Sequence, residues 1–544
     1  MELRGVYDRQ ERISSQTAYQ KDEQSTDLNQ PEFTSTAALM SNGVATLEAH
    51  AWRHLKKSYR RLMNRADQCI DQNRLCDAET SLLEGLGIAL DLHERAPDDR
   101  WLLRDIARIH YGVSQVKRQQ GFLDDALSAI RACHDMIERL ANIDPSHIAR
   151  QNNLTISHAA IRDTLEEKGD RRLAVAAARF AVISAERVAD LFDHRPDLRH
   201  EIIRQRLALA TLLDDGNNGS KARIACLRLA CGTAKELPLQ YAVSDDVWTE
   251  VRRVHLDLAN ALQLTKQYDE TIEILEEFRG YAMLRLVSGP NEIAQNNTVA
   301  LADYLKGLVF VMKREYATAI GCFVKGLGLY DAIPIHIFLT DEVQQQRAKL
   351  LGEAMKAAEH ASDKTLKPMI EKLSLRRLKA ILQDKSIGAH YALDVMARTH
   401  ELARMLIVKQ VPHLALHCLS YAETILISQS STDDNPIFVQ RWAGFLKLEE
   451  GRAFGAMSRV VEAQTALRKS LVLNEDLWAA NPEDVRAQCD IAYAEWQLAP
   501  HTPSSKREHL RRSRAILRML DRSGRLPEYA KPWLDEIERD LRVA

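Results

Sequence analysis

The sequence has few of the residues that many folds require. Only 6% of its 544 residues are aromatic, and it contains 22 glycines and 15 prolines. These numbers are too low for a β-sandwich, barrel or propeller, which needs many tight turns. The eight cysteines include no Cys-x-x-Cys pair, so we interpret them as scattered buried thiols rather than as a disulfide framework or a zinc site.

Neither sign of charge dominates, and long apolar runs are absent. The 74 basic and 76 acidic residues give a net charge of −2, so no overall charge attracts the chain to nucleic acid or to an anionic membrane. No apolar stretch approaches about eighteen residues, and the first twenty residues contain no apolar segment of signal-peptide length. We therefore expect a cytoplasmic protein that does not bind membranes or specific nucleic acids.

The chain does contain a long internal repeat. Hydrophobic residues make up 45% of the sequence, enough for a large buried core. Steps of about 48 residues from Ala78 reach a column of anchor positions, seven of which are alanine: Ala78, Ala126, Ala174, Ala222, Thr271, Ala319, Lys367, Ala415, Ala463 and Arg511. A fixed period of this length is the signature of a repeat architecture.

Independent columns support the same period. Twelve residues before the anchors, eight of ten positions hold a small residue, such as Ala66, Gly307 and Gly451. Four residues after the anchors, nine of ten positions are apolar, such as Leu82 and Leu467. Small residues let two helices approach closely, and a larger apolar residue one turn away fills the space beside them.

Each unit has the pattern of two helices. Apolar residues recur at three- and four-residue spacings on both sides of short turns such as 120–124 and 168–172, and proline closes many units. The pattern predicts an all-α fold, an α-solenoid of about ten antiparallel helical hairpins over about residues 50–530. Each helix of near 20 residues would be roughly 30 Å long.

This pattern resembles the tetratricopeptide repeat family, which places small residues where this chain has Ala259 and Thr271 and a bulky apolar residue where it has Leu275. The resemblance covers about 480 residues, although the family's basic unit has 34 residues and this one has about 48. It is most similar to the long-unit arrays of bacteria. The resemblance implies a right-handed superhelix whose concave wall, formed by the first helix of each pair, binds peptides.

The periodicity divides the chain into four segments. Residues 1–48 are polar and aperiodic and are expected to form a disordered tail. Six units occupy residues 49–340, and three more occupy residues 389–544, the last being an Arg-rich cap. Between them, residues 341–388 form a degenerate seventh unit with Lys367 at the anchor. This unit is either a hinge or an ordinary unit with a shifted register.

No motif for catalysis or for a cofactor is present. The sequence lacks a phosphate-binding glycine loop, a His-Glu-x-x-His zinc motif and a Gly-x-Ser-x-Gly nucleophile elbow. Cys133 is followed by His134 but occupies a packing column, so we interpret it as a core residue. His413 and His417 share a helix face, and Cys418 follows, but no further ligand accompanies them. We expect no enzyme activity, no cofactor and no metal, and leave a metal at these three residues open.

One column could bind a ligand. Eighteen residues before the anchors, four of the first five positions are arginine, namely Arg60, Arg108, Arg204 and Arg253. Regularly spaced guanidinium groups suit carboxylates or phosphates. The alternative is pairing with acidic residues of neighbouring helices. We take these four arginines, with Asn260, as candidate groove residues.

Shape and composition together favour a non-catalytic scaffold. Stacked hairpins bury a continuous core and leave one long surface for another protein, here an acidic or extended segment of a partner. The alternative is a regulator of a bacterial signalling or defence system, which responds to a peptide or small ligand and controls a separate effector. The sequence does not fix the partner or the oligomeric state.

Overall fold

The computed structural model describes residues 42–97, 99–213, 221–288, 292–384, 388–430 and 436–543. These residues form helices and connecting turns and contain no strand. Contacts divide the chain into unit 1, residues 1–265, and unit 2, residues 266–544. Residues 1–41 of the expected disordered tail lie outside the described part, and the first described helix begins at Asn42.

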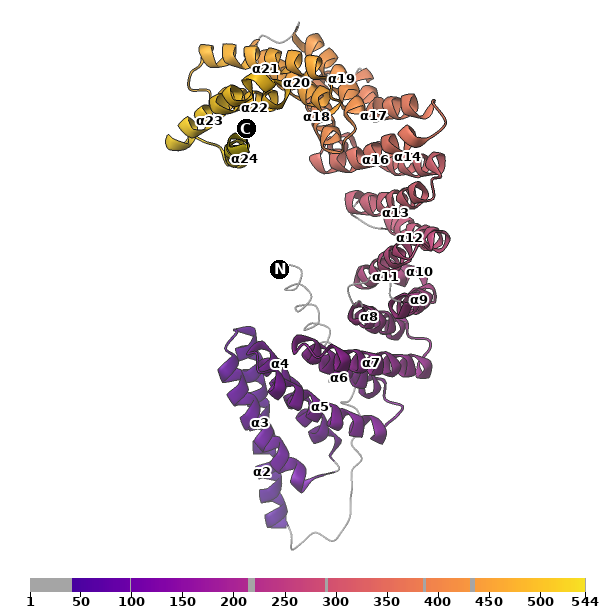
Figure 1. The fold of residues 1–544 in the computed structure, drawn as a ribbon. Helices are drawn as coiled ribbons and strands as arrows, with labels where there is room; N and C mark the ends of the chain where they lie inside the picture. Colours follow the sequence, from indigo (N-terminus) through magenta and orange to yellow (C-terminus); the bar gives the residue numbers. More distant parts are fainter. Residues whose placement is uncertain are drawn as a thin grey trace. The chain divides into compact units, whose positions relative to one another are not determined.

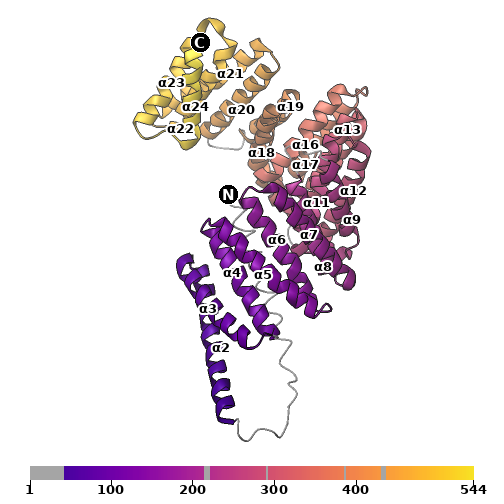
Figure 2. The same ribbon diagram turned by 60° about the horizontal axis from the view of Figure 1, so that its bottom comes forward.

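Unit 1 consists of antiparallel hairpins that stack in chain order, as two views show (Figures 1 and 2). Its pairs are α2 with α3, α4 with α5, α6 with α7, and α8 with α9, before α10 and α11. The bounds are α2 Asn42–Asp71, α3 Leu75–Arg95, α4 Arg100–Gln119, α5 Leu123–Ile143, α6 Ile148–Glu167, α7 Arg171–Leu191, α8 Pro196–Leu212, α9 Lys221–Lys235, α10 Leu239–Ala242 and α11 Asp245–Leu264.

Unit 2 continues the same architecture after α12, pairing α13 with α14, α16 with α17, α18 with α19, α20 with α21, and α22 with α23. Its helices are α12 Tyr268–Ser288, α13 Glu292–Met312, α14 Tyr316–Asp331, α15 Ile335–Phe338, α16 Asp341–His360, α17 Leu366–Gln383, α18 Gly388–Val408, α19 Pro412–Ser430, α20 Pro436–Ala456, α21 Val460–Ala480, α22 Val485–Leu498, α23 Lys506–Arg522 and α24 Lys531–Val543, with 3₁₀ turns at Ala499–His501, Pro503–Ser505 and Glu528–Ala530. The predicted all-α solenoid of helical hairpins is confirmed.

The repeat columns form the interface inside each hairpin. Seven anchors are fully buried: Ala78, Ala126, Ala174, Thr271, Ala319, Ala415 and Ala463. The small residue twelve positions earlier lies against the apolar residue four positions later. At Gly451 a methyl group would stand 2.5 Å from Cγ of Leu467, so the helices could not keep their present distance with any larger residue there.

The fourth hairpin corrects the predicted register by one residue. Ala222 was expected at the anchor, but it is exposed, and Arg223 takes the buried position. Leu227 and Ala230 follow at the four- and seven-residue positions and are fully buried. The extra residue of this repeat therefore lies before α9 rather than after it.

The seventh hairpin departs from most others at its turn. In seven other turns the second residue after the helix end has a positive φ angle: Asn73, Gly121, Gly169, Lys266, Arg314, Gln410 and Ser458. The connection between α16 and α17 has no such residue, and the Asp363 carboxylate accepts hydrogen bonds from Thr365 there. Lys367 is exposed, whereas Ile370 and Ser374 are buried, so α17 still packs. The hinge remains a prediction.

Two connections between hairpins contain an additional single-turn helix. α10 follows Pro238 and α15 follows Pro334, two repeats later in the chain. Both are followed by a hydroxyl residue, Ser244 or Thr340, at the start of the next helix. The common pattern is a proline, one helical turn and a Ser or Thr before an acidic pair.

Overpacking the anchor column should destabilise the fold. The substitution Ala174→Leu places a larger side chain at a fully buried helix crossing, so we expect the free energy of unfolding to fall by about 1–3 kcal/mol. Ala176→Leu on the exposed face of the same helix is the control and should change it by less than about 0.5 kcal/mol. Urea unfolding followed by circular dichroism measures both, and equal effects would show that Ala174 is not at a tight crossing.

The turn residues predict a stabilising substitution. Ser458 has a φ of 59°, in the left-handed region where a side chain is unfavourable by roughly 1–2 kcal/mol. Its neighbour Arg459 donates a backbone hydrogen bond to the Phe454 carbonyl at 2.9 Å, which closes the helix end. Ser458→Gly should therefore raise the free energy of unfolding by about 1 kcal/mol. Ser458→Ala keeps the Cβ atom and should give no gain, and thermal melting of both variants tests this.

Candidate functional site

The candidate groove residues all lie on first helices of unit 1, but three of the arginines have partners within the protein. Arg108 on α4 binds Asp67 on α2, with Nη2 3.0 Å from Oδ2. Arg253 on α11 donates to the Thr211 hydroxyl of α8 at 3.2 Å. Both arginines link neighbouring first helices, but only Arg108 does so through an acidic residue, as the alternative interpretation of the column expected.

The other candidates differ in their surroundings. Arg204 on α8 pairs with Glu201 of its own helix at 3.0 Å. Arg60 on α2 and Asn260 on α11 are exposed, and no ion pair of Arg60 is found within the described residues. A ligand-binding role for this column therefore remains a prediction, with Arg60 as its least engaged arginine.

The possible nucleophile of the sequence is a core residue. Cys133 is fully buried, and burial raises the pKa of its thiol to about 12, so the thiol is protonated at neutral pH. His134 contacts the Ser157 hydroxyl through Nδ1 at 2.9 Å and lies beside His158, whose pKa burial and the neighbouring His134 lower to about 4. The His158 ring is therefore neutral at pH 7, and the buried Cys133 thiol stays protonated.

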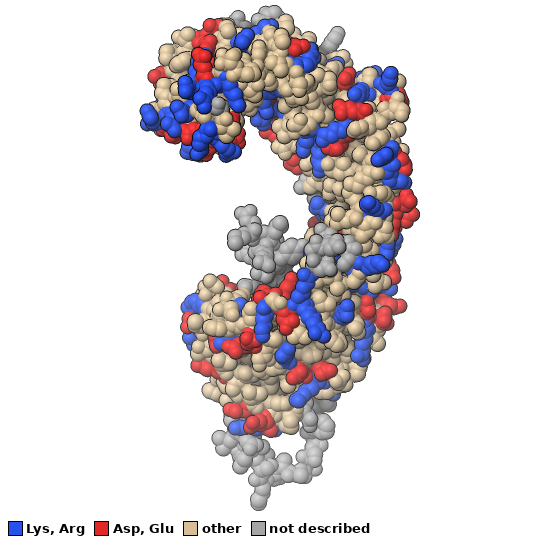
Figure 3. Space-filling model, in the orientation of Figure 1, with Lys and Arg blue, Asp and Glu red and all other residues tan. Residues whose placement is uncertain are grey.

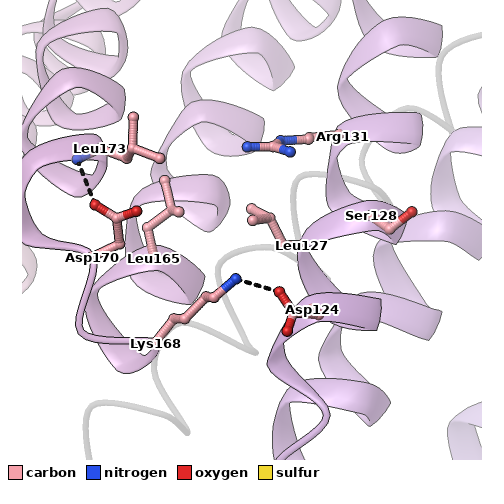
Figure 4. Close-up of a pocket in the computed structure, with 8 residues that line it drawn as sticks. All are labelled: Asp124, Leu127, Ser128, Arg131, Leu165, Lys168, Asp170 and Leu173. Carbon is pink, nitrogen blue, oxygen red and sulfur yellow. Dashed lines mark hydrogen bonds and ion pairs between the residues drawn. The ribbon is translucent and has the colours of Figure 1, made fainter.

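One surface cavity of about 310 Å³ lies between α5 and the turn from α6 to α7 (Figure 4). Lys168 of the lining pairs with Asp124, and Asp170 accepts a hydrogen bond from the Leu173 backbone amide at 3.2 Å, capping α7. The lining contains no histidine or cysteine: Asp124, Leu127, Ser128, Arg131, Leu165, Lys168, Asp170 and Leu173. Both carboxylates of this lining are thus engaged within the protein.

The three C-terminal residues considered for a metal do not converge. His413 is exposed, His417 is half-buried, and Cys418 is fully buried with the pKa of its thiol raised to about 12 by burial. Within the described residues no three or more His, Cys, Asp or Glu side chains are placed to hold a metal ion.

Unit 2 carries a charge pattern on its first helices that the sequence columns missed. Acidic and basic residues three positions apart recur at steps of 48 residues on α16, α18 and α20: Glu353 with Lys356 at 3.0 Å, Glu401 with Arg404 at 2.6 Å, and Glu449 with Arg452 at 2.7 Å. In each pair the carboxylate is more buried than its cation, and the Arg404 side chain is 53% exposed. The carboxylates thus fix the positions of the cations, of which Arg404 is the most exposed and Arg452 the least.

Aromatic side chains surround these pairs. On α18 and α20, His400 meets Trp442 with ring centroids 5.6 Å apart, and Trp442 meets Phe445 at 5.7 Å. On α22, Tyr493 lies 5.8 Å beneath the Arg452 guanidinium, and its ring packs on Trp533 of α24 at 4.6 Å. Burial raises the pKa of Tyr493, and the charges of Arg452, Glu449 and Arg404 also act on it, which shows how closely these groups gather.

We call this surface the aromatic–arginine face of unit 2. Its residues are His400, Arg404, Trp442, Phe445, Glu449, Arg452 and Tyr493. All the aromatic rings are partly exposed, so the face offers apolar contact area together with guanidinium donors. Phe445 and Tyr493 belong to the column that contains Arg60 and Arg108. The change in that column from arginine at its start to aromatic residues at its end is the sequence signal that could have found them.

The comparisons with known proteins give matches of low overall similarity. No family model and no curated protein matches the chain. Among solved structures, the apo form of RapI has 11% identity and a TM-score of 0.33, covering 77% of this chain and 98% of that one. A tetratricopeptide repeat protein from Parabacteroides merdae has 15% identity and a TM-score of 0.27, and the match covers 59% of this chain and 99% of that one. The apo quorum sensor NprR from B. thuringiensis has 13% identity and a TM-score of 0.25, with 77% and 99% covered.

None of the described helices has the length and apolar character needed to span a bilayer.

A buried carboxyl group next to the aromatic–arginine face makes stability depend on pH. Burial raises the pKa of Asp490 from 3.8 to about 7, although Arg486 and Arg441 oppose this rise. The folded state therefore favours the protonated form, and this contribution to stability is lost as pH rises from about 4 to about 7.

Asp490→Asn should remove this dependence. Relative to the parent, the variant should gain stability between pH 4 and pH 7, by at most about 4 kcal/mol, since one pKa unit corresponds to ~1.4 kcal/mol. Asp476→Asn, at an exposed position on α21, is the control. Urea unfolding at several pH values measures the free energy of unfolding of the parent and both variants. If it changes with pH in the same way in all three, Asp490 is not the group responsible for the pH dependence.

Proposed function

We propose that the protein is a non-catalytic interaction scaffold that binds an extended segment of another protein on the aromatic–arginine face of unit 2. The observation that carries the proposal is the convergence of Arg404, Arg452 and Tyr493 from three successive hairpins. Such a surface suits a segment that carries carboxylates beside apolar or aromatic side chains.

The local geometry supports recognition rather than chemistry. Arg404 and Arg452 are fixed by Glu401 and Glu449 and so lose little further side-chain freedom when a ligand binds. His400 is held neutral because burial lowers its pKa, and its ring serves as an apolar wall. A partner segment that lies across α18, α20 and α22 would meet both kinds of group.

The experiment begins with selection of linear peptides from a displayed library on the full-length chain. The affinity of a selected peptide is then measured by calorimetry. Arg404→Gln should weaken binding about tenfold or more, because a charge-assisted hydrogen bond contributes ~1.5–3 kcal/mol. Arg459→Gln is the matched control, since Arg459 also forms an ion pair with a glutamate three positions away, Glu462, at the start of α21. It should change the affinity less than twofold.

Two outcomes would contradict the proposal. One is that the two arginine variants weaken binding equally, and the other is that Tyr493→Ala leaves the affinity unchanged. A triple variant, R108Q/R204Q/R253Q, tests the arginine column of unit 1 in the same assay. If this triple variant weakens peptide binding and Arg404→Gln does not, the peptide binds at the arginine column of unit 1 that the sequence predicts.

The regulatory alternative has one supporting observation, the division of the chain into two compact units at residues 265 and 266. A ligand-responsive regulator would change its radius of gyration when the selected peptide binds, and a scaffold would not. Small-angle scattering with and without the peptide separates the two functions.

A further inference from the structure

The helix α23, Lys506–Arg522, carries a line of arginines on one side. Arg507, Arg511, Arg514, Arg518 and Arg522 follow one another at spacings of four, three, four and four residues, which places them on a single face of an α-helix. The opposite face is the one that packs, through Leu510, Ile516, Leu517 and Leu520. We call these five residues the α23 arginine stripe.

The stripe is accessible and largely without internal partners. Four of its arginines are exposed and Arg514 is half-buried. Arg518 pairs with Glu538 of α24, and for the other four no ion pair is found within the described residues. Figure 3 shows Lys and Arg side chains gathered over this C-terminal part of unit 2. The helix therefore presents a concentrated positive surface on a chain whose total charge is nearly zero.

A neighbouring arginine, Arg512, has a structural role inside the protein. Arg512 lies off the stripe and binds two carboxylates, Glu475 of α21 at 2.5 Å and the buried Glu495 of α22 at 2.6 Å. It thus links three helices of the last hairpins. The stripe arginines make no comparable set of contacts, so packing does not account for five guanidinium groups in line.

We propose that the α23 arginine stripe binds an extended acidic segment of a partner protein. A rise of 1.5 Å per residue spaces neighbouring stripe residues by about 4.5–6 Å and extends the stripe over roughly 22 Å. In an extended peptide, every second side chain points the same way at intervals of about 6.6 Å. Alternating carboxylates can therefore meet successive guanidinium groups, as Glu538 already meets Arg518.

Other polyanions fit this surface less well. The helix contains no Phe, Tyr or Trp on which the bases of a single strand could stack. A membrane surface would need apolar side chains beside the arginines, and Met519 is the one large exposed hydrophobic residue of α23. Carboxylates on a flexible chain need neither feature.

This surface is separate from the aromatic–arginine face, and the inference does not depend on the proposed function. The test uses the full-length chain and a fluorescein-labelled oligoglutamate peptide of about ten residues, long enough to span the stripe. Binding is followed by fluorescence anisotropy at about 0.05 M and about 0.15 M salt, with a polyglutamine peptide of equal length as the neutral reference.

The variant R507Q/R511Q/R514Q should weaken binding of oligoglutamate about tenfold, since each exposed charge pair contributes modestly. The matched control R172Q/R179Q/R187Q removes three exposed arginines from α7 and should change the affinity less than twofold. Tyr493→Ala should leave oligoglutamate binding unchanged, which separates this proposal from the proposed function. Thermal melting checks that both triple variants are folded.

The proposal is overturned if oligoglutamate binds no better than polyglutamine, or if the α7 variant weakens binding as much as the α23 variant. It is also overturned if a DNA duplex of equal charge competes at lower concentration than oligoglutamate and its binding is lost in the α23 variant. That result would assign the stripe to nucleic-acid phosphates.

Discussion

The structure depends on the close approach of two helices at a small residue. At Gly451 the space for a side chain is occupied by Leu467 of the facing helix, and the buried anchor Ala463 lies one turn away. The same contact recurs between Gly307 and Phe323, so the two helices of that hairpin also approach closely. Hairpins of this kind stack in chain order, and stacking places their first helices side by side. The candidate surfaces are a result of this packing.

The sequence allowed the fold to be predicted because the packing contacts use few residue types. Small residues at a crossing leave a periodic trace, and Ala78, Ala126 and Ala174 are all fully buried as expected. The register failed at Ala222 because an alanine is also acceptable on an exposed helix face. A connection outside the core can lengthen by one residue without a change in composition, so the column alone did not locate the insertion.

The candidate site was less predictable because surface residues are defined by their partners. Arg108 and Arg253 share a column, yet Asp67 and Thr211, which contact them, lie about forty residues earlier in the chain. The aromatic–arginine face was hidden for the opposite reason. Tyr493 contacts Arg452 from the preceding hairpin, and neither residue is unusual by itself. Contacts between successive repeats give such residues their role, and a single column does not contain them.

The short helices α10 and α15 have a consequence for how the array is built. Each begins after a proline and precedes a hydroxyl residue, and the two prolines, Pro238 and Pro334, stand 96 residues apart, which is two repeats rather than one. The segment between these two junctions comprises two repeats, and a junction of the same type lies at each of its ends. We call this segment a cassette. Such a cassette could be duplicated or exchanged by recombination with the same type of junction at either end, which makes a pair of hairpins a natural unit of growth.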